Sequence, residues 1–103
     1  MNYRLKATNE FRADFNDATN YIANTLHNPI AAEALLDELV KNVKSVTVFP
    51  KASKAYASPP EVDADYYALR VKNYLAFYVV RGDVIEFRRF LYARADLRDR
   101  LKT

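Results

Sequence analysis

The chain has 103 residues, 50% of them apolar and 14% aromatic, which is enough for one hydrophobic core but too little for two. It contains no cysteine and one histidine, so disulfides, thiol nucleophiles and zinc sites built from Cys and His are excluded. No apolar run approaches the roughly 20 residues of a membrane span, and no signal-peptide pattern opens the sequence. We therefore expect a single domain over residues 1–103, located in the cytoplasm and not associated with a membrane.

The net charge of +3 is unevenly distributed along the chain. Residues 1–65 carry seven basic and nine acidic side chains, whereas residues 66–103 carry nine basic and four acidic ones. A basic half on a small domain favours an anionic or acidic macromolecular partner. The alternative is a solvated surface whose uneven charge has no function.

The first half of the chain is predicted to form a strand and a helix. Residues 3–7 alternate apolar and basic side chains, which is typical of a short strand. Thr8 or Asn9 can then cap a helix by accepting a backbone hydrogen bond. An apolar stripe with three- and four-residue spacing follows, formed by Phe11, Phe15, Ala18, Ile22 and Leu26.

A second helix is predicted to begin at Asn28-Pro29 and to end before Pro50. Asparagine is a good N-cap, and proline suits the first turn because its missing donor costs nothing there. The two helices should form an antiparallel hairpin. The residues expected to face inward from the second helix are Ala32, Leu35, Leu36, Leu39, Val40, Val43 and Val46.

The second half changes to the two-residue period of strands. Residues 51–65 contain a Pro-Pro pair and no period, so we expect a long loop. Gly82, the only glycine, can supply the positive φ of a tight hairpin. A short basic helix or tail should close the chain over residues 94–103. The three expected strands cover residues 66–72, 74–80 and 84–93.

The expected order of elements is therefore β-α-α-β-β-β. Strands that are grouped in sequence favour an antiparallel sheet, with the helical hairpin packed on one face. The sequence thus predicts an α+β fold.

Counting residues excludes several kinds of site. One glycine cannot build a phosphate-binding glycine loop, and His27 lies at a predicted turn between helices rather than beside a nucleophile. The Arg- and Tyr-rich last third can still bind phosphate and stack on or protonate a base. A metal-independent endoribonuclease without cofactors is one expectation, in which Tyr92, Arg94 and Arg70 are catalytic and Lys72, Arg88 and Arg98 bind RNA phosphate.

Two arginines of the last strand also have a purely structural interpretation. Arg88 shares a strand face with Glu86, so a salt link between them is expected. In an unbroken strand Arg89 would lie on the same face as its apolar neighbours. We therefore expect it to be a structural arginine whose hydrogen bonds are satisfied within the fold. Arg70 and Lys72 share a face of the preceding strand and can adjoin Tyr92 across the sheet.

Several segments together resemble the RelE/ParE toxins. They are the opening strand, the helical hairpin with Asn28-Pro29 followed by Ala31-Ala32, and the LRVKNYLAFYVV and RRFLYARADL segments. In that family a strand of the form N/G-Y-R/L-x-x-Y-x-V precedes one of the form R-V-x-H/Y-x-R-R-D. The matching residues are Asn73, Tyr74, Leu75, Tyr78, Val80, Arg89, Phe90, Tyr92, Arg94 and Asp96.

The resemblance implies the toxin of a bacterial type II toxin–antitoxin system, which arrests growth when it is free of its antitoxin. Ribosome-dependent mRNA cleavage is the first mechanism it implies, with the ribosome and mRNA as partners. In such relatives an arginine commonly stands where this chain has Leu75, and some have a histidine where it has Tyr92. A non-enzymatic inhibitor of DNA gyrase, like the ParE relatives, and an inactive relative that only binds its antitoxin are the alternatives. A toxin–antitoxin hetero-oligomer is expected in each case.

Overall fold

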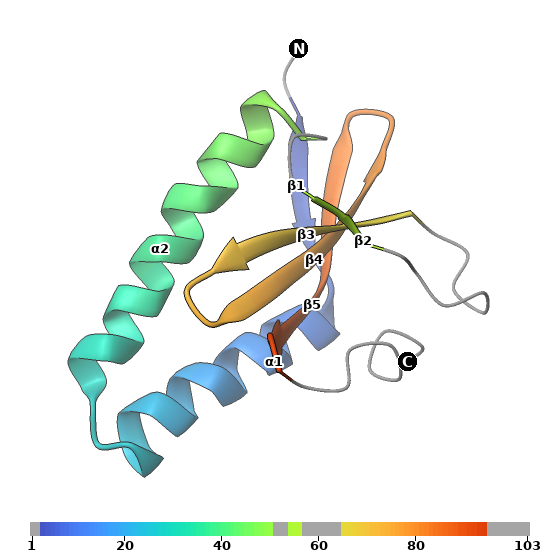
Figure 1. The fold of residues 1–103 in the computed structure, drawn as a ribbon. Coiled ribbons are helices and arrows are strands. Elements are labelled where there is room, and N and C mark those ends of the chain that lie inside the picture. The colour runs from blue at the N-terminus through green and yellow to red at the C-terminus, as the bar shows by residue number, and fades with distance from the viewer. Residues whose placement is uncertain (1–2, 51–53, 57–64, 95–103) are drawn as a thin grey trace.

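The structure, a computed structural model, describes residues 3–50, 54–56 and 65–94 as a twisted sheet with two helices on one face (Figure 1). The predicted α+β class and the order of a strand, two helices and a three-strand meander are confirmed. In the part of the chain that is described, no helix is long and apolar enough to cross a membrane. The elements are β1 (Arg4–Ala7), α1 (Asn9–Asn20), the π-helix η1 (Tyr21–Thr25), α2 (Pro29–Val48), β2 (Lys54–Tyr56), β3 (Tyr66–Val71), β4 (Tyr74–Arg81) and β5 (Val84–Tyr92).

The first helix begins where the sequence predicts and ends differently. The Thr8 hydroxyl accepts a hydrogen bond from the Phe11 amide at 3.1 Å, so Thr8 is the N-cap. At the far end the chain widens into the π-turn η1, in which the Leu26 amide donates to the Tyr21 carbonyl. A π-turn contains one residue more than a turn of α-helix, so the side chains that follow it point in other directions around the helix axis than in an unbroken α-helix. The placement of Leu26 in the buried stripe was therefore wrong, and its side chain is exposed.

The second helix starts at its predicted cap, since the Asn28 side chain accepts from the Ala31 amide at 3.0 Å. Its buried face is narrower than expected. Leu35 is almost fully buried, whereas the side chains of Leu36 and Val40 are 47% and 48% exposed. The expectation that Leu36 and Val40 face inward was wrong, because they lie about 100° around the helix from the stripe that meets the sheet.

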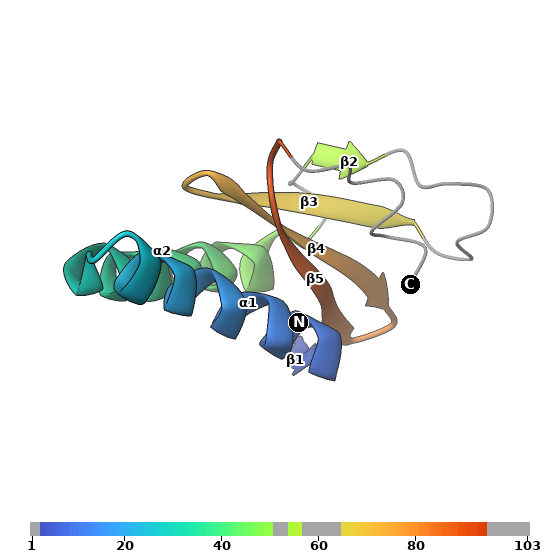
Figure 2. The same ribbon diagram turned by 90° about the horizontal axis from the view of Figure 1, so that it is seen from below.

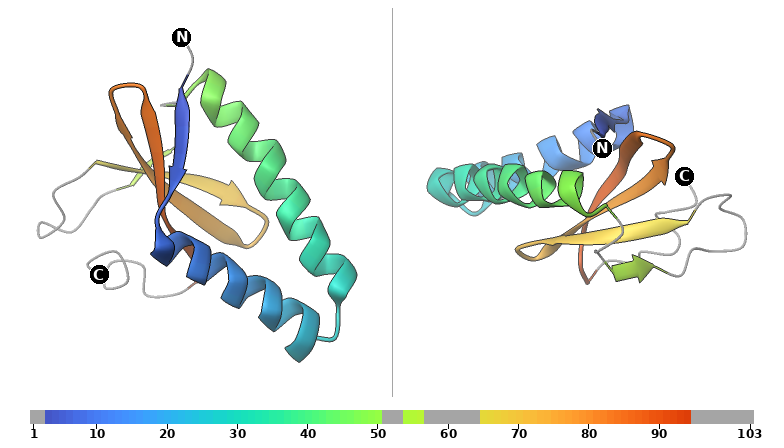
Figure 3. Two further views of the ribbon diagram at one scale, coloured as in Figure 1. Left: turned by 180° about the vertical axis from the view of Figure 1, so that it is seen from behind. Right: turned by 90° about the horizontal axis from the view of Figure 1, so that it is seen from above.

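The sheet has the strand order β1-β5-β4-β3-β2. The pairs β3–β4 and β4–β5 are antiparallel, as predicted, and so is the unpredicted pair β2–β3. The strand β1 runs parallel to β5, so the expectation of a fully antiparallel sheet was wrong and the sheet is mixed. Short turns impose antiparallel pairing only on β3, β4 and β5, whereas both helices separate β1 from β5 and permit a parallel crossover. In Figures 2 and 3 both helices lie on the same side of this sheet.

The segment predicted as a loop over residues 51–65 contains the short strand β2, which pairs with β3. A three-residue strand leaves no periodic pattern, which is why the sequence did not indicate it. The rest of this loop is outside the described residues, apart from Asp65. The helix or tail predicted over residues 94–103 is described only at Arg94.

Two tight turns join the meander. Gly82 has a φ of 59°, which confirms its predicted role in the β4–β5 turn. Lys72 has a φ of 53° in the β3–β4 turn, where Val71 pairs with Tyr74. A lysine is strained in this left-handed region, unlike a glycine.

Apolar side chains bury both faces of the sheet. The larger cluster lies between the sheet and the helices, and its most buried members include Leu35, Val71, Tyr78 and Ile85. The Tyr78 hydroxyl donates to the Pro50 carbonyl just after α2 and so ties the end of this helix to β4. The second cluster, on the other face, contains Tyr66, Phe77, Val79 and Leu91.

A β-bulge at Arg88 changes which side chains of β5 face the helices. Tyr78 pairs with Phe87 and Phe77 pairs with Arg89, so Arg88 has no partner in the ladder. Such an extra residue reverses the alternation beyond it. Phe87 and Phe90 therefore both pack in the helix-side core.

Candidate functional site

A cavity of about 680 Å³ lies between the tip of the helical hairpin, the β3–β4 turn and the end of β5. We call it the tyrosine cavity, because Tyr21, Tyr74 and Tyr92 come to it from three different elements. The remaining lining residues are Ile22, Leu26, Asn28, Ala31, Leu35, Lys72 and Asn73. The walls are thus mainly apolar, and Lys72 is the one basic residue among the described residues that line them.

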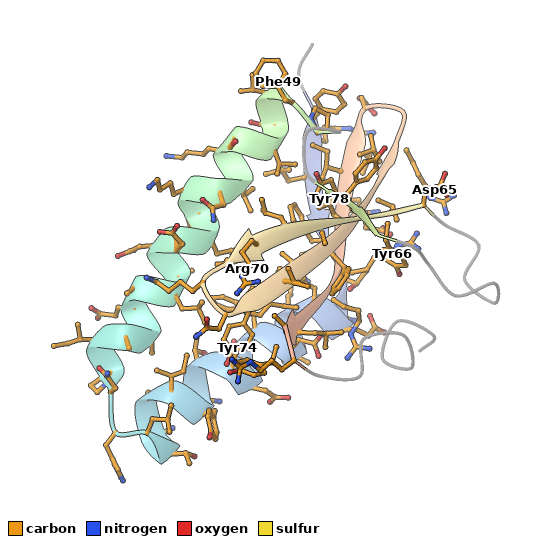
Figure 4. The ribbon with its side chains drawn as sticks, in the orientation of Figure 1. Phe49, Asp65, Tyr66, Arg70, Tyr74 and Tyr78 are labelled. Atoms are coloured by element: carbon orange, nitrogen blue, oxygen red, sulfur yellow. The ribbon has the colours of Figure 1, made fainter. Side chains whose placement is uncertain are left out.

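Two aromatic contacts hold the side chain of Tyr74, which is labelled in Figure 4. Its ring stacks on Phe90 with centroids 5.0 Å apart, and it meets the ring of Tyr92 edge-on at 5.5 Å. Burial raises the pKa of the Tyr74 phenol, and the neighbouring Tyr92 and Tyr21 raise it further because phenolate charges would repel one another. Tyr74 is therefore a neutral hydrogen-bond donor at physiological pH.

Two of the predicted site residues, Lys72 and Tyr92, come together in this cavity. Tyr92 pairs with Tyr74 across the β4–β5 ladder, and its side chain is 43% exposed. Arg70 is also exposed, and its Nε donates to the Lys72 carbonyl. Arg70 thus braces the turn that carries Lys72, without itself lining the cavity.

Arg88 lies elsewhere on β5. Its Nε donates to Glu86 Oε1 at 2.7 Å, so the expected salt link is present, and its guanidinium lies 5.9 Å from the centre of the Tyr66 ring. Burial lowers the pKa of Arg88, but the bonds to Glu86 and Tyr66 outweigh this effect and leave the pKa raised. The positive charge is therefore neutralised within the fold.

Arg89 is bound still more tightly. Its Nε and one terminal nitrogen donate to the two carboxylate oxygens of Asp14 on α1, at 2.7 and 3.0 Å. Both side chains are only 10% exposed. The hydrogen bond to Asp14 raises the pKa of Arg89 more than burial lowers it. The expected structural arginine with satisfied bonds is confirmed.

The remaining candidates are less constrained. Arg94 is exposed, two residues beyond β5, and Arg98 is outside the described residues. Within residues 3–50 and 65–94, no group of three or more acidic or histidine side chains could hold a metal ion. The predicted residues therefore do not form one compact constellation. Lys72 and Tyr92 share a cavity, Arg70 supports it through the backbone, and Arg88 is paired on another part of the sheet.

Sequence reasoning missed three residues that shape these sites: Asp14, Tyr21 and Tyr66. Asp14 and Arg89 are 75 positions apart, and no local pattern joins them. Tyr21 lies beside the predicted apolar stripe, begins the π-turn η1 and lines the tyrosine cavity. The aromatic content of the chain was the one available signal for Tyr66.

A further surface feature is the row of large apolar side chains that the helical hairpin exposes. Leu36 and Val40 lie one turn apart on α2, on the side away from the buried stripe. Other exposed members on the hairpin are Tyr21, Leu26 and Ile30.

Comparisons with known proteins agree with this geometry. Residues 5–97 match the family model described as the ParE toxin of the type II toxin–antitoxin system parDE. No curated protein sequence matches the chain significantly.

Solved structures share the fold at low sequence identity. A chain of the chromosomal ParDE toxin–antitoxin system from P. aeruginosa is 21% identical, with a TM-score of 0.68 over 89% of this chain and 97% of that one. A chain of the archaeal RelE–RelB complex from Pyrococcus horikoshii OT3 is 17% identical, with a TM-score of 0.61 over 92% and 100%. YafQ from E. coli is 15% identical, with a TM-score of 0.51 over 87% and 92%.

The family model covers nearly the whole described fold, from β1 through β5, and the structural neighbours share that fold. The chain belongs to the ParE toxin family of type II toxin–antitoxin systems.

Proposed function

We propose that this toxin arrests growth by binding DNA gyrase, like the gyrase-poisoning ParE relatives, and not by cleaving mRNA. The observation that carries the proposal is the internal pairing of the β5 arginines. Arg88 is held by Glu86 and Arg89 by Asp14, so their guanidinium groups are committed to the fold and do not offer a free charge to a scissile phosphate.

The position of Leu75 supports the same proposal. Nuclease relatives commonly carry a phosphate-binding arginine here. Leu75 instead packs against the second cluster and pairs with its member Leu91 across the β4–β5 ladder. An aliphatic side chain in this position contributes to the core and cannot bind an anion.

mRNA cleavage is the second candidate, and the shared cavity of Lys72 and Tyr92 favours it. The ammonium could neutralise a phosphate while the phenol of Tyr92 or Tyr74 donates a proton. Arg94, exposed just beyond β5, could contribute a second positive charge. We place mRNA cleavage second because Arg88 and Arg89 of the same strand are paired within the fold.

We further propose that an antitoxin covers the apolar side of the helical hairpin. The solved relatives include a RelE–RelB complex and a DinJ–YafQ toxin–antitoxin complex. In this chain Leu36 and Val40 offer apolar area that an amphipathic helix would bury. The expected product is a toxin–antitoxin hetero-oligomer whose formation blocks the toxin's action.

A supercoiling assay tests the proposal directly. Purified chain is titrated into DNA gyrase acting on relaxed plasmid, and separately into a translating extract whose mRNA is monitored for cleavage. We expect loss of supercoiling and intact mRNA, with supercoiling restored when the toxin is first mixed with the protein encoded by the adjacent reading frame. Cleaved mRNA with normal supercoiling would support the second candidate and overturn the first. No effect in either assay would indicate an inactive relative.

A further inference from the structure

We infer that the outer edge of β1 receives an extended segment of the antitoxin, which adds a strand to the sheet. This inference rests on the proposed antitoxin partner and specifies where and how part of it binds. The segment we expect carries alternating acidic and apolar side chains. Three features of β1 lead to this conclusion: its open backbone edge, an apolar cavity on one side and a basic cavity on the other.

The backbone of β1 is paired on one side only. Within the described residues β5 is its single neighbour in the sheet, and β1 forms the margin of the sheet in Figures 1 and 3. The amides of Arg4 and Thr8 donate to the carbonyls of Asp83 and Phe87, at 2.7 and 3.0 Å. Because alternate residues of a strand face the same neighbour, Lys6 also faces β5. The N–H and C=O groups of Leu5 and Ala7 therefore point outward and form a short edge that a partner strand can pair with.

The helix side of this edge is apolar. Leu5 and Ala7 are in register with Ile85 and Phe87, which belong to the helix-side core, so their side chains project to that face. A cavity of about 290 Å³ opens there, and Leu5, at its margin, is 48% exposed. An apolar side chain of an added strand would fill this space. Its other apolar lining residues are Phe11, Leu39, Val43 and Phe87, and the basic residues Lys6 and Arg12 stand at its margin.

The opposite side of the edge is basic. Arg4 and Lys6 project there and line a second cavity of about 490 Å³, whose other lining residues are Leu5, Arg81, Val84 and Glu86. The Glu86 carboxylate is already engaged by Arg88. Arg4 reaches Asp83 only in a solvent-exposed contact at 3.3 Å, which an incoming carboxylate can replace. An acidic side chain on the added strand would therefore meet complementary charge.

Alternation connects the two cavities. Successive side chains of an extended strand point to opposite faces of the sheet. A segment paired with Leu5 and Ala7 would thus direct one side chain to the apolar cavity and its neighbour to the basic one. This arrangement accounts for the acidic and apolar alternation that we expect in the partner.

The competing interpretation is that Arg4 and Lys6 only protect the edge from unwanted strand pairing, as charged residues on edge strands often do. Amide hydrogen exchange separates the two interpretations. In the free toxin the Leu5 and Ala7 amides should exchange fast and the Lys6 amide slowly. In the co-expressed complex with the protein encoded by the adjacent reading frame, Leu5 and Ala7 should exchange about a hundredfold more slowly and approach Lys6.

A proline substitution provides the second measurement. Leu5→Pro removes an outward N–H and leaves the β1–β5 hydrogen bonds in place, which edge strands tolerate. The control is Leu5→Ala, which loses the side chain but keeps the N–H. We expect Leu5→Pro to bind the protein encoded by the adjacent reading frame about tenfold more weakly than Leu5→Ala does. The charge-reversed variant Arg4→Glu/Lys6→Glu, altered only at the surface, should also bind about tenfold more weakly or worse.

The outcomes are distinguishable. If a complex forms but Leu5 and Ala7 still exchange rapidly and all variants bind like wild type, the β1 edge is not the site, although the antitoxin proposal stands. If wild-type toxin forms no complex with that protein, the antitoxin proposal fails, and the inference about β1 fails with it.

Discussion

Asp14 of α1 and Arg89 of β5 form a two-point ion pair, with N–O distances of 2.7 and 3.0 Å, at the place where the β1–β5 ladder ends. The same carboxylate accepts the Phe90 amide at 3.0 Å, and the Thr8 hydroxyl donates to the Arg88 carbonyl at 3.0 Å. Side chains from the start of α1 thus replace a neighbouring strand along this part of β5. The pair closes the sheet edge and removes Arg89 from contact with a ligand.

Breaking this pair should destabilise the fold. Asp14→Ala leaves Arg89 and the Phe90 amide without their acceptor, and we expect the free energy of unfolding in urea to fall by about 3 kcal/mol. Arg4→Ala is the matched control, since its partner Asp83 is exposed, and it should cost less than about 0.5 kcal/mol. Similar losses for the two variants would contradict a stabilising role of the Asp14–Arg89 pair.

Two adjacent leucines on α2 should respond very differently to truncation. Leu35 is buried in the helix-side core, and Leu35→Ala should cost about 3 kcal/mol because it leaves a cavity. Leu36→Ala removes an exposed side chain from the same helix and should cost less than about 1 kcal/mol. Thermal and urea unfolding measure both values. A large loss at Leu36 would show that it contributes to the core.

The pKa of Tyr74 predicts how stability changes at alkaline pH. Burial and the neighbouring phenols raise this pKa above the usual tyrosine value of about 10, so the folded state holds the phenolic proton more tightly than the unfolded state. The resulting stabilisation is fully present below about pH 10 and is lost as the pH rises through the folded-state pKa. Ultraviolet titration of phenolate should show a late-titrating tyrosine that Tyr74→Phe removes. If the late-titrating group persists in that variant, Tyr74 is not its source.

Removing the groups that an RNA-cleavage mechanism would use should leave toxicity intact. Tyr92→Phe and Arg94→Gln keep the size of each side chain while removing the phenolic hydroxyl or the charge, and both positions are exposed. We expect induced expression of either variant to arrest growth as the wild type does. Circular dichroism provides the folding control. Loss of growth arrest in a folded variant would return these residues to a catalytic role.

Local chemistry allowed much of the fold to be predicted from the sequence. Thr8 and Asn28 cap their helices as expected, and Gly82 forms the tight turn. These features depend on a few consecutive residues, whose hydrogen-bonding capacity and backbone freedom can be read directly.

Features that depend on contacts distant in sequence were not predictable. The parallel pairing of β1 depends on where the helices place it, and the π-turn that displaces Leu26 has no compositional signature. The bulge at Arg88 reversed the strand alternation on which the assignments for β5 relied. The role of Arg89 also depends on a distant contact, because its partner Asp14 lies on α1, far from β5 in the sequence.

The most direct test of the central claim is induced expression of the toxin with parallel measurements of plasmid supercoiling and of protein synthesis. Gyrase inhibition predicts that plasmids relax first and that translation declines only afterwards, with full-length mRNA still present. Immediate loss of protein synthesis with cleaved mRNA and unchanged supercoiling would contradict the proposal.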